Sequence, residues 1–299
     1  MGSSFSLMAV TEGESEAQEY LQMGIREIER IEALLTEFNA HSETSRINDQ
    51  AYEKPVEIST ECFNLIKRAQ QISGMTGGCF DISVAPLKKL YNFKNEIFEM
   101  PGPQLISDAL KQTGYKSIIL NEKNQTIRFT KPGMKISFAA IGKGYASDRV
   151  MKLWKNNGLT SGYINASGDL NAFGSEMDGE PWKIGVSDPD DKTKIILNIP
   201  LFNASVATSG DAEQHFIYKG KKYAHNIHPK TGLPLSGIKS VTVLSPAAEL
   251  SDALATAIYV MGVKEGLRFV PQLPETHVII IDEANRIHFS KNLQYEAVG

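Results

Sequence analysis

The chain has 299 residues, of which 41% are hydrophobic and 22% are charged, so it carries enough apolar material to bury a sizeable core. Its net charge of −4 and its pI near 5.9 argue against a broad nucleic-acid-binding surface, which needs clustered Lys and Arg. No apolar run approaches the roughly 20 residues of a membrane helix. We therefore expect neither a nucleic-acid partner nor a membrane span in this chain.

The first third of the chain predicts a strand followed by two helices. Residues 5–10 suit a short strand, and residues 15–38 repeat apolar side chains at spacings of three and four, which is typical of an amphipathic helix. A second helix opens at Ser59 and ends at the glycine-rich segment Thr76-Gly77-Gly78. This glycine-rich end predicts a loop in which chemistry is possible.

The rest of the chain mixes short strands with two further helices. A meander of three strands is predicted at 117–120, 126–129 and 134–138. A helix running to about Asn156, short strands between 182 and 216, and a helix over 251–261 follow. No linker-like tract or internal repeat divides the chain. We therefore predict an α+β fold with mixed or antiparallel sheets, in a single domain over residues 1–299.

A glycine turn begins the helix that runs to Asn156. Ile141-Gly142-Lys143-Gly144 puts two glycines and a lysine at a helix N-terminus, where backbone N–H groups, the helix dipole and the Lys143 charge all favour an anion such as phosphate. The alternative is a turn that only tightens strand-to-helix packing, and the segment alone does not decide between the two. Its spacing is not the G-x-G-x-x-G of dinucleotide-binding folds.

Two further segments carry polar side chains suited to chemistry. His225 and His228 flank a short segment that ends in a Pro-x-Thr-Gly turn, and His225 is a candidate base at neutral pH, although a surface pair is equally consistent. Asp252 and Thr256 lie four residues apart on one helical face, which suits Mg²⁺. For Asp252 the alternative is a purely electrostatic role at the helix N-terminus.

Taken in order, these segments resemble the FAD:protein FMN transferase (ApbE) family, and the similarity runs from Met1 almost to Phe269. The matching segments are Met1-Gly2, Ser42 to Asn48, Thr76 to Asp81, Gly142 to Asp148, Asn165 to Asp169, Thr208 to Asp211, His225 to Gly232 and Ser251 to Ala257.

The resemblance implies a Mg²⁺-dependent enzyme that moves FMN from FAD to a threonine of an acceptor flavoprotein of the respiratory electron-transport type, with release of AMP. The residues that it implies around FAD are Met1, Phe38, Cys79, Phe80, Asp81, Ser137, Lys143 and Ile227. The residues that it implies at Mg²⁺ are Ala140 through its carbonyl, Asp252 and Thr256. His225 is implied to act near the transferred phosphate. A Mg²⁺-dependent FAD pyrophosphatase and a non-catalytic FAD-binding protein are the alternatives.

The chain departs from the family pattern at two positions. The family often has Asp where Ser137 and His228 stand, which alters one expected polar contact to FAD and the geometry of the histidine segment. The family also often carries a lipoprotein signal, and none is present in this sequence. A periplasmic or lipid-anchored protein whose signal has been removed and a cytoplasmic protein therefore both remain expectations.

Overall fold

The computed structural model describes residues 3–91, 99–211 and 215–297, which fall into two compact units. Unit 1 comprises Met1–Ile31, Ile141–Ala212 and Gly237–Gly299, and unit 2 comprises Glu32–Ala140 and Glu213–Ser236. The prediction of one domain over residues 1–299 stays a prediction.

Unit 1 contains a seven-stranded sheet in which every neighbouring pair of strands is antiparallel. In spatial order its strands are β1 (Phe5–Ala9), β5 (Gly162–Ala166), β6 (Asp169–Phe173), β9 (Ala204–Gly210), β12 (Ile238–Ser245), β13 (His277–Asp282) and β14 (Ile287–Phe289). A second antiparallel sheet consists of β15 (Glu296–Ala297), β8 (Ile195–Leu201) and β7 (Trp182–Ser187). Strands β8, β12 and β13 are rich in Val, Ile and Thr, which favour strand formation.

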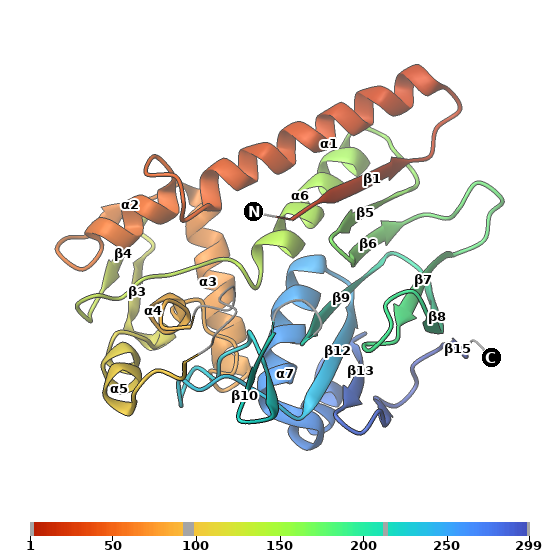
Figure 1. Cartoon of the computed structure of the whole chain (residues 1–299). Coiled ribbons are helices and arrows are strands. Elements are labelled where there is room, and N and C mark those ends of the chain that lie inside the picture. The colour runs from red at the N-terminus through yellow and green to blue at the C-terminus, as the bar shows by residue number, and fades with distance from the viewer. Residues whose placement is uncertain (1–2, 92–98, 212–214, 298–299) are drawn as a thin grey trace. The chain divides into compact units, whose positions relative to one another are not determined.

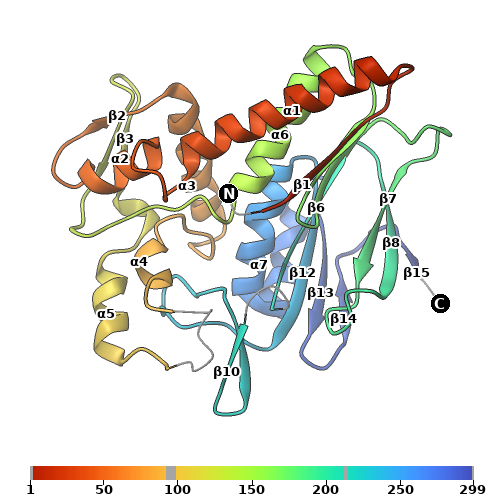
Figure 2. The ribbon, with the colours of Figure 1, turned by 45° about the horizontal axis from the view of Figure 1, so that its top comes forward.

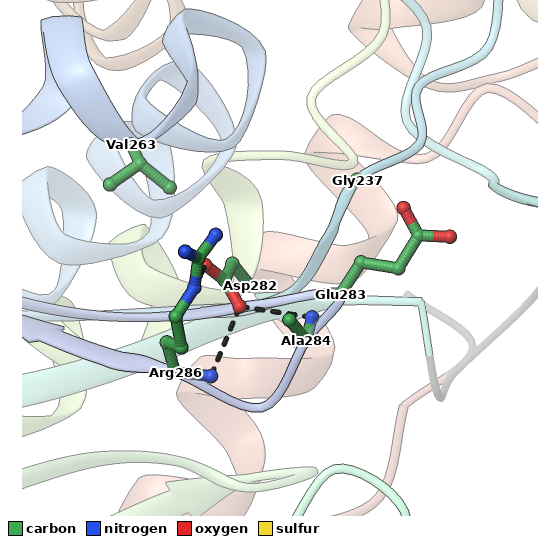
Figure 3. A pocket seen from close by; sticks show the side chains of 6 residues that line it. All are labelled: Gly237, Val263, Asp282, Glu283, Ala284 and Arg286. Atoms are coloured by element: carbon green, nitrogen blue, oxygen red, sulfur yellow. Dashed lines mark hydrogen bonds and ion pairs between the residues drawn. The ribbon is translucent and has the colours of Figure 1, made fainter.

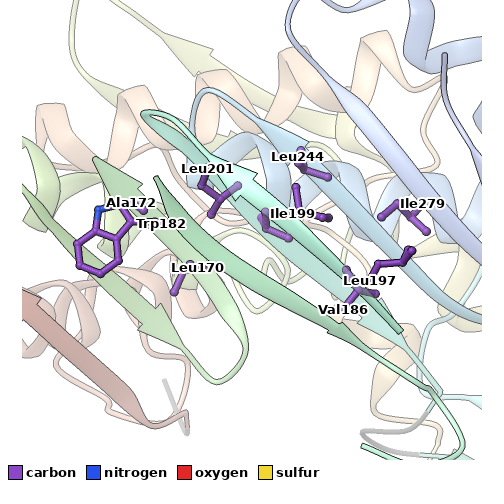
Figure 4. Close-up of a cluster of buried hydrophobic side chains, with 10 residues drawn as sticks. Leu170, Ala172, Trp182, Val186, Leu197, Ile199, Leu201, Leu244 and Ile279 are labelled. Atoms are coloured by element: carbon purple, nitrogen blue, oxygen red, sulfur yellow. The ribbon is translucent and has the colours of Figure 1, made fainter. Parts of the chain in front are cut away.

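The large sheet of unit 1 lies between helices and the smaller sheet (Figures 1 and 2). The helices of this unit are α6 (Gly142–Asn156), α7 (Ala248–Phe269), the 3-10 helix η2 (Val270–Gln272) and the part of α1 (Glu14–Leu35) that ends at Ile31. On the helical face Trp154 packs with Ile164 and Phe173. On the other face Trp182 joins a cluster from both sheets (Figure 4). Each large side chain buried in this way stabilises the fold by about 1.5–3 kcal/mol.

Unit 2 combines short helices with a small sheet and a hairpin (Figure 1). Its helices are α2 (Glu43–Gln50), α3 (Thr60–Met75), α4 (Ala85–Lys88), α5 (Pro103–Lys111) and the 3-10 helix η1 (Tyr115–Ser117). Its strands are β2 (Val56–Glu57), β4 (Thr126–Phe129) and β3 (Ile118–Asn121) in one antiparallel sheet, and β10 (His215–Tyr218) with β11 (Lys221–Ala224) in the hairpin. A separate apolar cluster joins Leu87, Tyr91, Ala109 and Ile227.

The predicted α+β class with antiparallel sheets is confirmed, but the predicted meander is wrong in its third strand. The third strand beside β4 is β2, and residues 134–138 form no strand. Instead the backbone of Ile136 exchanges two hydrogen bonds with the Asn48 side chain, at 2.7 and 2.9 Å, and the N–H of Ser137 donates to the carbonyl of Ile82. The Asn48 side chain and the loop at Ile82 thus bind the backbone N–H and C=O groups that would otherwise have paired with a neighbouring strand.

Helix α7 is longer than the predicted 251–261. It begins at Ala248, and Gly262, with φ of 83°, interrupts it with a non-helical residue before it continues to Phe269. Only glycine adopts this backbone conformation readily. Over the described part of the chain, none of the helices is long and apolar enough to span a membrane.

Candidate functional site

The glycine turn of unit 1 lies where helices α6 and α7 come close together. Helix α6 begins at Gly142, directly after Ile141, whose φ of −152° and ψ of −21° are not helical. The N–H of Gly144 donates to Oδ2 of Asp252 at 3.1 Å, and a Cβ on Gly144 would overlap the backbone carbonyl of Ala248. The packing interpretation is therefore correct for Gly144. The same hydrogen bond places the N-terminus of α6 beside the carboxylate of Asp252, which the sequence predicts as a metal ligand.

Lys143 forms an ion pair that the sequence analysis did not predict. Its ammonium lies 2.5 Å from Oδ2 of Asp169, and the two side chains are only 18% and 10% exposed. Oδ1 of Asp169 accepts a hydrogen bond from the N–H of Thr208 at 2.9 Å. Lys143 is thus held at a fixed place by β6 and β9. The only signal for this in the sequence is that Asp169 ends one family-like segment and Thr208 begins another.

Asp252 and Thr256 lie one turn apart on α7, as predicted. Asp252 is 6% exposed, while Thr256 is half-buried with its hydroxyl 3.4 Å from that of Ser209 on β9. One carboxylate with nearby hydroxyls is a hard-oxygen donor set, which fits Mg²⁺ because this ion keeps several of its waters. Among the described residues no three His, Cys, Asp or Glu side chains cluster around a possible metal position. Of the three predicted ligands, only Asp252 carries a carboxylate.

Ala140, the predicted carbonyl ligand, is the last residue of one segment of unit 2 and is half-buried. Asp252 and Thr256 belong to unit 1, so the shared ligand set stays a prediction. Met1 lies outside the described residues.

The glycine-rich loop after α3 is present in unit 2, and its predicted residues differ in exposure. Gly77 and Gly78 both have positive φ, which turns the chain away from the helix end. Cys79 is half-buried, whereas Phe80 is 1% exposed and its ring is part of the core. Phe80 thus presents almost no side-chain surface for a ligand.

The carboxylate of Asp81 is already used within unit 2. Oδ1 accepts hydrogen bonds from the N–H and the hydroxyl of Ser83 at 2.8 and 2.7 Å, and Oδ2 accepts one from the N–H of Tyr115 at 2.8 Å. Burial nevertheless raises the pKa of Asp81. These bonds make Asp81 the residue that joins the glycine-rich loop to η1.

The histidine segment follows β11 in unit 2. His225 is half-buried, and Ile227 is buried against Leu87 and Tyr91 and forms a bridge to Pro234. The hydroxyl of Tyr91 donates to the carbonyl of Gly232 at 2.6 Å, which holds the end of the turn. The segment is therefore anchored by apolar packing on one side of His225.

His228 takes over the turn-forming role of a short acidic side chain. Its ring nitrogen Nδ1 accepts a hydrogen bond from the N–H of Lys230 at 3.1 Å, which is the bond that Asp or Asn makes in an Asx turn. Burial, and then the charge of Lys230, lower the pKa of His228, which favours the neutral ring needed for this acceptor. The departure from the family pattern at this position is therefore compensated locally.

Phe38 and Ser137 lie at opposite extremes of exposure in unit 2. The ring of Phe38 is 93% exposed, and Ser137 is 8% exposed. The hydroxyl of Ser137 donates to Oε1 of Glu37 at 2.8 Å. Sequence reasoning missed Glu37, because no motif includes it.

A surface pocket of about 430 Å³ in unit 1 contains none of the predicted site residues (Figure 3). The carboxylate of Asp282 in it accepts hydrogen bonds from the N–H groups of Ala284 and Arg286 and from Nε of Arg286. His288, together with these bonds, holds the pKa of Asp282 well below its usual range. This pocket lies beside the turn between β13 and β14 and contains none of the predicted residues, so it is not the candidate site.

The comparison with known proteins identifies the family of the chain. The model of the ApbE family matches residues 1–280 of the chain. The chain belongs to the ApbE family. A relative from Klebsiella pneumoniae named FAD:protein FMN transferase is 30% identical over 292 residues, with 97% of this chain and 89% of the relative covered. A protein of the same name from Haemophilus influenzae is 30% identical over 254 residues, or 80% of this chain and 73% of that protein.

Solved ApbE structures share the fold. The crystal structure of the ApbE protein from Thermotoga maritima superposes with a TM-score of 0.89 at 32% identity, and the match covers 97% of this chain and 94% of that one. The α+β architecture with antiparallel sheets is thus the architecture of an ApbE protein.

Proposed function

We propose that this chain is a Mg²⁺-dependent FAD:protein FMN transferase that attaches FMN to a threonine hydroxyl of an acceptor protein and releases AMP. The observation that carries the proposal is membership of the ApbE family together with the arrangement of Lys143, Asp169 and Asp252 around the start of α6. The curated relatives bear the name of this activity.

The reaction exchanges the phosphoanhydride bond of FAD for a phosphoester bond to the acceptor threonine. The threonine oxygen attacks the phosphorus of the FMN half, the bond from that phosphorus to the bridging oxygen breaks, and the bridging oxygen leaves with AMP. His225 takes the threonine proton as the base. The Lys143 ammonium attracts the pyrophosphate as a point charge. Such a displacement needs positioning and charge stabilisation more than covalent chemistry from the protein.

The residues proposed to hold Mg²⁺ are Asp252, Thr256 and the carbonyl of Ala140. When bound, the ion supplies neutralisation of the negative charge that develops on the pyrophosphate oxygens. The N–H of Gly144 donates to Oδ2 of Asp252, which fixes the orientation of the carboxylate proposed to bind the cation. The buried position of Asp252 at a helix-to-helix contact supports a defined geometry for this ligand.

The acceptor in this proposal is a flavoprotein of the respiratory electron-transport type that carries a threonine flavinylation motif. This partner and the threonine come from the family resemblance. A water molecule in place of threonine would give free FMN and AMP instead.

The test is to incubate the purified chain with FAD, Mg²⁺ and an acceptor domain that contains the threonine motif. Intact mass spectrometry of the acceptor and chromatography of the free flavins then follow the products. The proposal expects a gain of one FMN on the acceptor, lost when EDTA is added or when the acceptor threonine is replaced by valine. Free FMN and AMP without labelling would establish a pyrophosphatase instead, and unchanged FAD would contradict catalysis with this acceptor.

A further inference from the structure

The hydroxyl of Ser137 holds a carboxylate from another part of unit 2. Ser137 lies on a rigid segment, because Asn48 binds both backbone groups of the preceding Ile136 and the N–H of Ser137 donates to Ile82. From this fixed position its hydroxyl donates to Oε1 of Glu37 at 2.8 Å. The carboxylate of Glu37 is therefore confined to one place, although Glu37 lies in the bend that follows α1.

Glu37 is half-buried and has spare acceptor capacity. Within the described residues, the Ser137 hydroxyl is the hydrogen-bond partner of its side chain, and no Lys, Arg or His lies within ion-pair distance. A carboxylate has about four lone-pair positions, and Ser137 occupies one of them. A partly desolvated anion without a neighbouring cation is stabilised by further N–H or O–H donors. The position is therefore prepared to accept hydrogen bonds.

The neighbouring residue adds a flat apolar surface. Phe38 is 93% exposed, although a phenyl ring normally contributes to stability by being buried. Its backbone is held by a hydrogen bond from its N–H to the hydroxyl of Thr36 at 3.2 Å. An exposed ring next to a carboxylate suits a planar heterocycle that stacks on the ring and donates an N–H to the acid. Both ring systems of FAD have this chemistry, through the flavin imide and the adenine amino group.

We propose that Glu37 is a FAD-binding residue whose carboxylate, held by Ser137, accepts a hydrogen bond from a ring N–H of FAD. It takes the place of the aspartate that the family often has at position 137. This inference rests on the proposed function, because that function supplies FAD as the substrate. An anion at Glu37 would repel the pyrophosphate, so its partner is one of the two neutral ring ends of FAD.

The first experiment measures the Kd for FAD by flavin fluorescence in three proteins: the wild-type chain, Glu37→Gln and Glu53→Gln. Glu37→Gln keeps the shape and an oxygen for Ser137 but removes the charge, so we expect Kd to rise about tenfold, as for loss of a charge-assisted hydrogen bond. Glu53 is exposed, so Glu53→Gln makes the same charge change elsewhere in unit 2 and should leave Kd within about twofold. Unchanged melting temperatures exclude an effect of misfolding.

A second variant tests whether a carboxylate at position 137 can replace the carboxylate of Glu37. Adding Ser137→Asp to Glu37→Gln restores a carboxylate at the fixed segment and should recover most of the lost affinity. Titrations with FMN and with ADP identify the ring, because the weakening should appear with the fragment that carries the donor. Equal FAD affinity in Glu37→Gln and wild type would overturn the inference and leave the proposed function intact. Failure of the wild-type chain to bind FAD would overturn both.

Discussion

The ammonium of Lys143 lies 2.5 Å from Oδ2 of Asp169, and the other oxygen of this carboxylate binds the N–H of Thr208. A lysine at the first turn of α6 is thereby tied to two strands of the central sheet of unit 1. Both side chains are largely buried, so solvent screens the pair less than it screens a surface pair. Asp169 is therefore the residue that positions the ammonium proposed to meet the pyrophosphate.

Asp169→Asn should lower kcat for FAD about tenfold while changing the Kd for FAD much less. The amide oxygen can still accept the Thr208 N–H, but the NH₂ group cannot bind an ammonium, so Lys143 keeps its charge and loses its position. Steady-state kinetics and fluorescence titration measure the two quantities. Asp108→Asn removes an exposed carboxylate that binds Lys111 and should change neither. An unaltered kcat in Asp169→Asn would contradict the positioning role.

Gly144→Ala should destabilise the protein by about 3 kcal/mol, because the added Cβ overlaps the carbonyl of Ala248 and pushes α6 from α7. The free energy of unfolding in urea measures this change. Gly74→Ala is the matched control, because Gly74 lies in α3 with open space around it. There alanine should stabilise by about 0.5–1 kcal/mol. The two substitutions should therefore change the free energy of unfolding in opposite directions. Equal changes would refute the packing role of Gly144.

The sequence predicted the elements that have a strong local signal. Apolar periodicity located α1, and capping and glycine signals located both ends of α3. Strand β6 was missed because Asp169 and Asn171 interrupt its apolar pattern. These polar side chains bind Thr208 and Asp148 within unit 1, so tertiary contacts stabilise a strand that local propensity disfavours.

Motif chemistry named the residues of the candidate site but not the side chains that hydrogen-bond or ion-pair with them. Lys143, Asp252 and Thr256 were named from residue type and spacing, and Asp252 and Thr256 do lie on neighbouring turns of α7. The contact from Ser137 to Glu37 joins residues 100 positions apart, and no periodicity or motif encodes such a pair. The turn made by His228 was equally hidden, because it replaces a carboxylate with a ring nitrogen.

Asp252→Asn should raise the Mg²⁺ concentration needed for half-maximal turnover at least tenfold, because the amide lacks the charge that attracts the cation. The fold should be retained, since the amide oxygen can accept the N–H of Gly144. Asp252→Ala should in addition lower the free energy of unfolding by about 1–3 kcal/mol, because that buried N–H loses its acceptor. Titration of activity with MgCl₂ measures the first effect. A wild-type Mg²⁺ dependence in Asp252→Asn would exclude this residue as a ligand.

Asp148 on α6 closes the N-terminus of α7. Its two oxygens accept hydrogen bonds from the N–H groups of Ala248 and Glu249 at 2.9 and 2.8 Å, while Ala247 at the helix start provides no side-chain cap. Despite these bonds, burial raises the pKa of Asp148 to about 6, and the negative charge of Glu249 acts in the same direction. Ionisation of this carboxyl therefore costs the folded state free energy.

The stability contribution of Asp148 should be fully present below about pH 4, the pKa of the unfolded chain, and should be lost as the pH rises through about 6. A shift of about two pKa units corresponds to about 3 kcal/mol. Asp148→Asn cannot titrate, so the free energy of unfolding of wild type minus that of the variant should fall by up to this amount between pH 4 and 7, as urea denaturation would measure. For Asp191→Asn the difference should instead rise slightly with pH, because Thr193 lowers the pKa of the exposed Asp191. A constant difference for Asp148→Asn would show that the carboxylate is ionised throughout, as an ordinary helix cap is.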